Sequence, residues 1–281
     1  MTHLLVATDL SDRSERAQRR ATLLARRHGL AIRLIHVIDA EQPDALIDSQ
    51  HDQATSILQR LARTIETSDG IGCSTDVRTA GSVEAGIHSA VNDETRLVIL
   101  GSHRKRPFRD LFLGGTSERI IAHAERPVLI VQGPPIEDYR KVLLTTDLSA
   151  GSREAADQLA GQSLIADASV MVLHVAGSLE QSATASNQAT ASGQEKMLAH
   201  AQAVAADALN RLVTESNLGM VAQRVEADPR PIAATILEVA EREATDLIVL
   251  TPRQPTGVET FLRYSVTTRM LNASPVDLLV L

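Results

Sequence analysis

A short segment between two apolar stretches gathers the residues best suited to bind an anion. Its basic side chains stand close together along the chain: Arg104, Lys105, Arg106 and Arg109. One acid, Asp110, stands against them, in a chain whose net charge is −7. Gly114-Gly115 follow, just before a helical stretch with Thr116 or Ser117 as its expected N-cap. Free amides at a helix N-terminus favour a phosphate, so the segment predicts a polyanion site; the alternative is a solvated loop with a glycine turn.

A second candidate group follows the first apolar run and recurs later in the chain. Residues 4–11 read LLVATDLS and residues 142–149 read VLLTTDLS. In the first copy Asp9 comes at the end of an expected strand, where its carboxylate can accept hydrogen bonds from a ribose hydroxyl or an amino group. The alternative is a carboxylate that caps the following helix, alone or with Ser11. The recurrence at Asp147 shows only that both copies share the feature.

These groups need a scaffold that positions them, and the apolar pattern indicates one. Short runs rich in Val, Ile and Leu alternate with amphipathic stretches, which is typical of β-α-β units around a parallel sheet. In the first copy we expect strands at 3–8, 31–37, 73–79, 96–100 and 127–132. In the second copy we expect helices near 152–166, 195–216 and 231–243. The predicted fold class is α/β and doubly wound, with a five-stranded parallel sheet in each copy.

The internal repeat sets the predicted domain organisation. We expect two tandem domains, at 1–133 and 138–281, because Gly133-Pro134-Pro135 would break both helix and sheet. The offset between matching segments drifts along the chain, which indicates an insertion in the polar stretch 178–194. An open parallel sheet binds ligands outside the carboxyl ends of its strands, where the strand order reverses. Both candidate groups of the first copy belong at that edge.

Composition narrows the class of protein. The 281 residues are 43% hydrophobic and 22% charged, as in globular proteins. No apolar run reaches the ~18 residues that span a bilayer, and the first residues lack the pattern of a secretory signal. The single cysteine, Cys73, excludes an intrachain disulfide and a cysteine-based zinc site, so we expect a cytoplasmic protein with no membrane insertion. The acidic net charge and an aromatic content of 2% argue against a nucleic-acid partner.

Taken together, the motifs resemble those of the universal stress protein family, and each half of the chain is similar to one of its domains. The nucleotide signature of that family is Gly-x-x-Gly, nine residues, then Gly-Ser/Thr. Here Gly101-Ser102-His103-Arg104, nine residues and Gly114-Gly115-Thr116 match that spacing. Thr8-Asp9, His36-Val37 and Pro127-Val128 also fit. The resemblance implies tandem Rossmann-like domains of the adenine-nucleotide-hydrolase-like superfamily.

The same resemblance implies a site for ATP, with Mg²⁺ as an expected companion. By this resemblance the adenosine contacts are Ala7, Asp9 and Val37, and the phosphates are held by Gly101, Gly114, Gly115 and Thr116. Neighbouring residues complete the candidate set: Thr8, Leu100, His103, Arg104 and Ser117. Two positions depart from the family pattern. Arg104 replaces a glycine, adding both bulk and charge, and Gly115 replaces Ser or Thr, losing a hydroxyl but keeping its N–H.

The second half departs further. Thr251 and Tyr264 take the places of two loop glycines, and either side chain would occupy phosphate space. We therefore expect this domain to be a degenerate pairing domain or to hold a second ligand, with Asp147 and Val175 lining a small pocket. The family commonly pairs its domains through their last strands, so we expect intramolecular pairing of residues 127–132 with 275–281, and a homo-oligomer such as a dimer.

Three functions stay open. The first is a stress-response regulator that binds ATP or a related adenine nucleotide in the first domain and thereby alters its contacts with a regulatory protein partner. The second is an enzyme restricted to slow ATP hydrolysis or autophosphorylation, because no Walker A, Ser-His-Asp or metal-site spacing is present in the sequence. The third is a dimeric scaffold that binds no nucleotide. We assign no catalytic residue or metal ligand.

The histidines and the cysteine are interpreted separately. His36 and His174 stand at matching strand ends, so we interpret them as structural hydrogen-bonding residues. His103 lies in the cationic segment and is expected to approach a phosphate or base. Cys73 is interpreted as a buried and unreactive thiol.

Overall fold

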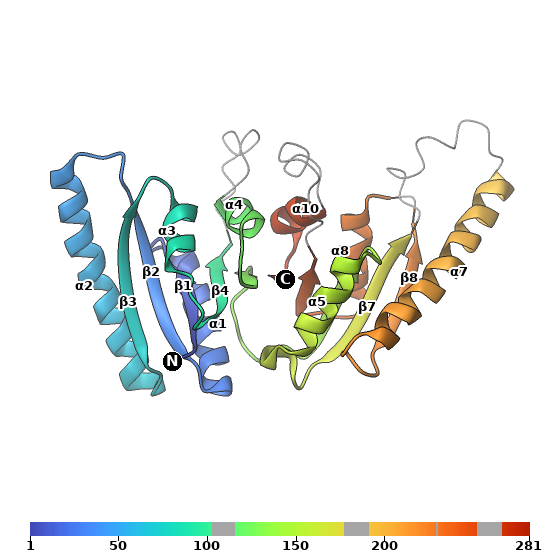
Figure 1. Cartoon of the computed structure of the whole chain (residues 1–281), viewed down its shortest axis with the longest axis horizontal. Helices are drawn as coiled ribbons and strands as arrows, with labels where there is room; N and C mark the ends of the chain where they lie inside the picture. Colours follow the sequence, from blue (N-terminus) through green and yellow to red (C-terminus); the bar gives the residue numbers. More distant parts are fainter. Residues whose placement is uncertain (103–115, 177–190, 229, 252–265) are drawn as a thin grey trace. The chain divides into compact units, whose positions relative to one another are not determined.

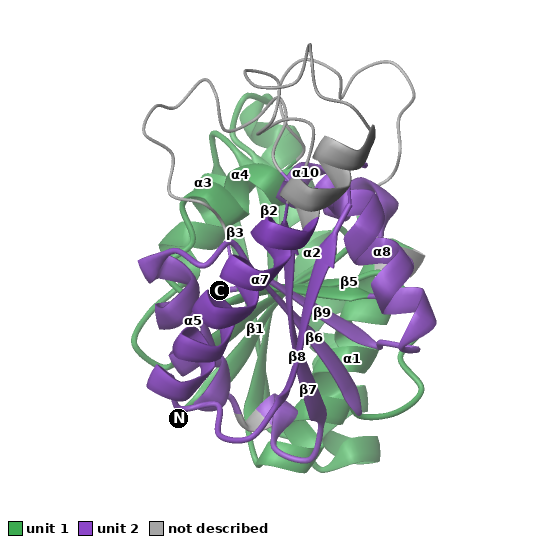
Figure 2. Cartoon of the chain, turned by 90° about the vertical axis from the view of Figure 1, so that its right-hand side faces the viewer, with its two compact units in different colours: residues 1–138, 277–280 green, residues 139–276, 281 purple. Residues whose placement is uncertain are grey.

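The computed structural model describes residues 1–102, 116–176, 191–228, 230–251 and 266–281 (Figure 1). The chain divides into two compact units. Unit 1 comprises residues 1–138 and 277–280, and unit 2 comprises residues 139–276 and 281 (Figure 2). The last strand of the chain therefore belongs to the unit built mainly from the first repeat.

Unit 1 is built on a parallel sheet with the strand order β3-β2-β1-β4-β5. The strand bounds are β1 His3–Ala7, β2 Ala31–Asp39, β3 Cys73–Ala80, β4 Thr95–Gly101 and β5 Val128–Val131. All four residues of β5 and the first four of β1 are buried, as expected for strands covered on both faces. β10 (Asp277–Val280) adds to the outer edge of β5 in the antiparallel direction. The strand order reverses between β1 and β4, which is where open sheets bind ligands.

The helices of unit 1 form two pairs. α1 (Asp12–His28) packs beside α2 (Asp44–Asp69), and α3 (Val83–Ala90) packs beside α4 (Thr116–Ala122) (Figure 1). α1 buries a stripe of small and apolar side chains, each at most 2% exposed: Ala17, Ala21, Leu24 and Ala25. The two pairs follow crossovers that run in opposite directions along the sheet, so right-handed connections put them on opposite faces.

Unit 2 repeats the central part of this plan, with its described strands in the parallel order β9-β6-β7-β8. The strand bounds are β6 Lys141–Thr146, β7 Ser169–Ala176, β8 Ala222–Ala227 and β9 Leu247–Leu250. The helix bounds are α5 Ala150–Ala160, η1 Ser163–Ile165, α7 Ala191–Glu215, α8 Ile232–Arg242 and α10 Val266–Ala273. Among the residues that the structure describes, no helix combines the length and apolar character needed to cross a membrane.

The doubly wound α/β fold predicted from the sequence is confirmed, with one local difference. The expected helix at 152–166 is wrong in its second half, because α5 ends at Ala160 and a separate 3₁₀ turn, η1, follows Gly161. The pairing expected between residues 127–132 and 275–281 is present, because β10 pairs antiparallel with β5. Most of the stretch 178–194 lies outside the described residues, and α7 begins at Ala191. The domain limits 1–133 and 138–281 stay a prediction.

Candidate functional site

The turn after β1 fixes Asp9 at the carboxyl edge of the sheet in unit 1. Its Oδ1 atom accepts a bond from the Ser11 amide at 3.0 Å and another from the Ser11 hydroxyl at 2.6 Å. Burial raises the pKa of Asp9, but hydrogen bonds, first those from the hydroxyl and the amide of Ser11, outweigh it and hold the pKa below its ordinary value. Ser11 is the N-cap of α1 and makes no side-chain cap bond, because its hydroxyl is turned to Asp9. Asp9 thus presents an exposed, ionised carboxylate.

Thr8 ties this turn to α1. Its hydroxyl accepts a bond from the Leu10 amide at 3.0 Å and donates to Ser14 Oγ at 2.8 Å. Ser14 Oγ donates in turn to the Ser11 carbonyl oxygen at 2.7 Å. Leu10 adopts a φ of 62°, a left-handed conformation that costs a residue with a side chain about 1–2 kcal/mol. Such strain persists only where the surroundings enforce it, and it is concentrated at functional sites.

His36 supports the same turn from the neighbouring strand. Its Nδ1 atom lies 2.8 Å from the Thr8 carbonyl oxygen. A carbonyl oxygen only accepts, so Nδ1 carries the proton in this bond. The structural role predicted for His36 is therefore confirmed, and its partner is the residue before Asp9.

Val37 forms the apolar side of the candidate site. It follows His36 near the end of β2 and is half-buried. Gly86, the fourth residue of α3, packs directly on it: a Cβ atom at Gly86 would lie 2.6 Å from Val37 Cγ1. Real Cβ atoms do not approach so closely, so α3 can take this position only because residue 86 is glycine.

The far side of the switch point is formed by the end of β4. Leu100 is buried and Gly101 is half-buried, and the Ser102 amide donates to the Val131 carbonyl oxygen at 2.9 Å. The strand order places β4 directly beside β1, so this end lies next to the Asp9 turn along the sheet. Thr116 and Ser117 are the first residues of α4 and are half-buried. The remaining predicted phosphate contacts lie outside the described residues: His103, Arg104, Gly114 and Gly115.

A partly exposed ion pair connects α4 to α3. Arg119 Nε lies 3.1 Å from Glu84 Oε1, and Glu84 Oε2 is buried without a hydrogen-bond partner among the described residues. Burial raises the pKa of Glu84, but its own amide and the Arg119 guanidinium hold the pKa below its ordinary value. The pair fixes the helix that begins with Thr116 against the helix that contacts Val37.

Unit 2 reproduces the turn but not its surroundings. Asp147 Oδ1 accepts bonds from the Ser149 amide at 3.0 Å and from Ser152 Oγ at 2.8 Å. Leu148 has a φ of 63° and donates its amide to Thr146 Oγ1 at 2.9 Å. The matching histidine bond is present as well, with His174 Nδ1 2.9 Å from the Thr146 carbonyl oxygen. The turn at the strand end, with its aspartate, left-handed leucine and histidine hydrogen bond, is therefore common to both repeats.

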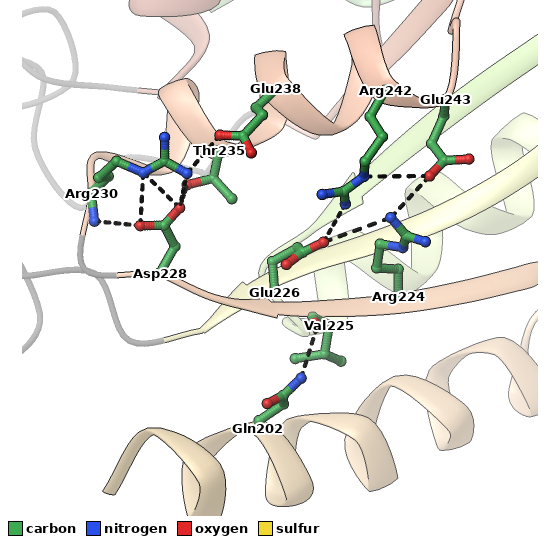
Figure 3. Close-up of polar contacts among 10 residues, drawn as sticks. All are labelled: Gln202, Arg224, Val225, Glu226, Asp228, Arg230, Thr235, Glu238, Arg242 and Glu243. Atoms are coloured by element: carbon green, nitrogen blue, oxygen red, sulfur yellow. Dashed lines mark hydrogen bonds and ion pairs between the residues drawn. The ribbon is translucent and has the colours of Figure 1, made fainter. Parts of the chain in front are cut away.

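The residues beside the turn differ in unit 2. Thr235 is the fourth residue of α8 and is 3% exposed; its hydroxyl donates to Asp228 Oδ2 at 2.9 Å (Figure 3). Arg230 donates to the same carboxylate from Nε and from Nη2, the latter at 2.6 Å. These bonds from Arg230 lower the pKa of Asp228 to about 2. Val175 is 8% exposed, and Thr251, after β9, has a buried hydroxyl with no partner among the described residues.

Sequence reasoning did not find several of these features. The contact of Gly86 with Val37, the left-handed Leu10 and the ion pair of Glu84 with Arg119 all depend on how α3 and α4 dock. One signal was present: a glycine inside a helical stretch costs about 1 kcal/mol relative to alanine, so it points to a packing requirement.

The cysteine has no part in the site. Cys73 is half-buried rather than fully buried, and burial raises the pKa of its thiol to about 12, so the thiol stays protonated and unreactive as predicted. Across the described part of the chain, no group of three His, Cys, Asp or Glu side chains is placed to hold a metal ion.

Comparison with known proteins gives a consistent result. The profile described as the universal stress protein family matches residues 1–132 and 138–281. A universal stress protein from Thermus aquaticus is 27% identical over 136 residues, covering 46% of this chain and 97% of the relative. A universal stress protein from Archaeoglobus fulgidus has a similar crystal structure, with a TM-score of 0.73, 19% identity and coverage of 99% of this chain and 95% of the other. A functionally unknown protein from Pseudomonas aeruginosa PAO1 gives a TM-score of 0.63 at 18% identity, covering 100% and 92% of the two chains. At these identities the two structures bear on the fold alone.

Proposed function

The chain belongs to the universal stress protein family, and from this premise we propose that unit 1 binds ATP or a related adenine nucleotide as a regulatory ligand. In this proposal nucleotide occupancy alters the contacts of the protein with a regulatory partner in the stress response. Unit 2 is a pairing domain, or it holds a different ligand.

The observation that carries the proposal is the Asp9 turn at the switch point. Both bonds from Ser11 engage Oδ1, and the carboxylate is exposed, so it can also accept a bond from a ribose hydroxyl. The carboxylate is ionised and held in one orientation by a strained turn, so little ordering remains to be done when a ligand binds. Such a fixed acceptor at the carboxyl end of β1 suits the sugar of a nucleotide.

The apolar and anionic parts of the ligand need separate contacts. Half-buried Val37 offers an apolar surface for the base, close to the ribose acceptor along the sheet. We assign the phosphates, with any Mg²⁺ they carry, to the glycines and cations between Gly101 and Ser117. Amides and guanidinium groups in that segment would neutralise the triphosphate.

A pair of matched substitutions tests the proposal. Asp9→Ala and Asp147→Ala remove equivalent turns, so both variants lose comparable structural contacts. We expect Asp9→Ala to weaken ATP binding by more than tenfold, about 1.4 kcal/mol or more, and Asp147→Ala to leave it unchanged. Isothermal titration calorimetry on full-length protein measures both, with circular dichroism to confirm folding.

Equal affinity in both variants and the parent would place the nucleotide elsewhere. No binding by the folded parent would favour a scaffold that takes no nucleotide. Mass spectrometry of small molecules released from freshly purified protein identifies the ligand directly.

A further inference from the structure

The edge of unit 1 is completed by a strand from the far end of the sequence. β10 pairs with β5 in an antiparallel register that sets Leu278 opposite Ile130 and Val280 opposite Val128. Every residue of both strands is buried. The seam is apolar except at the first residue of β10, which is an aspartate.

Asp277 is held by a set of charge-assisted hydrogen bonds inside unit 1. It is 4% exposed, and Arg20 of α1, which lies beside it, is 7% exposed. Arg20 Nε donates to Asp277 Oδ2 at 3.2 Å, and Arg20 Nη1 donates to the Glu137 carbonyl oxygen at 2.6 Å. The Gln132 amide donates to Asp277 Oδ1 at 2.8 Å, and the Gly133 amide reaches the same atom at 3.5 Å. The carboxylate thus joins α1 to the end of β5.

The repeat shows that neither member of this pair has a charged counterpart. Pro275-Val276-Asp277 corresponds to Pro127-Val128-Leu129, so β5 carries leucine where β10 carries aspartate. Arg20 follows the N-cap of α1 by the same number of residues as Gln158 follows the N-cap of α5. The ion pair can form only between the α1 of the first repeat and the last strand of the second.

We propose that the ion pair of Arg20 with Asp277 makes the β5 edge selective for the chain's own C-terminal strand over the β5 strand of a second copy. A second copy would bring Leu129 to the place of Asp277. Arg20 would then be buried without its carboxylate, and the Gln132 amide would lose its acceptor. Burying one member of an ion pair without the other carries a large energetic cost. This cost typically corresponds to a preference of roughly several hundredfold for β10 over the β5 strand of a second copy.

Competition between the two strands depends on concentration. The chain's own strand is tethered and acts at an effective concentration on the order of millimolar. Exchange between two copies replaces two β5–β10 seams with one β5–β5 seam and one β10–β10 seam, so the number of seams is unchanged. A second copy at several hundred micromolar can therefore compete once the charge preference is removed. The oligomeric mass of the full-length protein reports that competition.

Two variants separate selectivity from simple stabilisation. Arg20→Leu leaves Asp277 facing a leucine, which favours the Leu129 strand of a second copy. The double variant Arg20→Leu/Asp277→Leu replaces the pair with apolar side chains. It leaves no buried charge without its partner, and its β5 edge should no longer discriminate between the two strands.

The measurement is light scattering from 5 to 500 μM, compared with the parent at each concentration. We expect the average mass to rise above that of the parent most strongly for Arg20→Leu, and by about 1.3-fold at the highest concentration for the double variant. If the folded double variant keeps the parent's mass throughout, the pair only stabilises the seam and the proposal is wrong. Circular dichroism and urea unfolding establish that each variant is folded.

Discussion

Helix α3 of unit 1 and helix α8 of unit 2 occupy the same place in the repeat but differ at their fourth residue. Gly86 lets α3 press directly on Val37, whereas Thr235 in α8 donates a hydrogen bond to Asp228 at 2.9 Å. The turn that precedes these helices is nearly the same in both units, down to a leucine with φ near 62°. The two repeats therefore share the polar turn but differ in the residues beside it. In unit 1 these make an apolar contact, Gly86 with Val37, and in unit 2 they form an ionic network around Asp228.

This difference shows where a binding preference can change without disturbing the fold. The turn is enforced by bonds among neighbouring residues and by His36 or His174, so it persists in both units. The surface beside the turn depends on the fourth residue of the helix. Gly86 allows close contact with Val37, whereas Thr235 adds a hydrogen bond to a carboxylate that Arg230 also binds. Three experiments test this comparison.

The largest effect is expected from placing the unit 2 residue in unit 1. Gly86→Thr puts a Cβ atom 2.6 Å from Val37 Cγ1, so α3 or β2 must shift. We expect the free energy of unfolding to fall by about 3 kcal/mol, measured by urea denaturation followed by circular dichroism. Gly72→Thr is the control, because a Cβ atom there meets nothing within 4 Å. Equal stability of the two variants would show that α3 can retreat from β2 at little cost.

A smaller effect is expected from Asp228→Asn in unit 2. Bonds from Arg230 and Thr235 favour the ionised form, so at pH 7 we expect a loss of about 2 kcal/mol in the free energy of unfolding. The pKa of Asp228 is lowered from 3.8 to about 2, so its stabilisation is complete above pH 4 and is lost as the pH falls toward 2. Urea unfolding from pH 7 to pH 2 should show the parent approaching the variant only below pH 4. A constant difference across that range would contradict the assignment.

The smallest effect tests the feature that the two units share. Leu10→Gly and Leu148→Gly remove the cost of a left-handed residue, about 1–2 kcal/mol, but increase the entropy of the unfolded chain by about 0.5–1 kcal/mol. We expect the free energy of unfolding, measured by thermal denaturation, to rise by up to about 1 kcal/mol in each variant, with similar gains in both units. A gain in one unit alone would mean that the two turns are not equivalent. Leu10→Ala is the control, since alanine keeps the strained conformation without gain.

The sequence was sufficient to predict the fold and the polar part of the candidate site because those features are local or repeated. Apolar runs located the strands, and the recurrence of Asp9 and His36 as Asp147 and His174 marked the strand ends. The contact of Gly86 with Val37 could not be predicted, because it depends on the distance between a helix and a strand far apart in the chain. The end of α5 at Ala160 was missed because the apolar spacing continues past Gly161 into η1. The pairing of Asp277 with Arg20 joins opposite ends of the sequence, so no local pattern contains it.

The placement of β10 in unit 1 has a consequence for biosynthesis. A ribosome completes residue 138 and must then add about 140 more residues before Asp277 emerges. At 5–20 residues per second, the nascent first unit waits roughly 7 to 28 s with its β5 edge uncovered. During that interval the edge is open to other unfinished chains on the same messenger, so newly made protein should be more prone than mature protein to bind chaperones that shield exposed strands. Unit 1 is therefore begun before unit 2, but its β5 edge is covered only after residues 139–276 of unit 2 have been made.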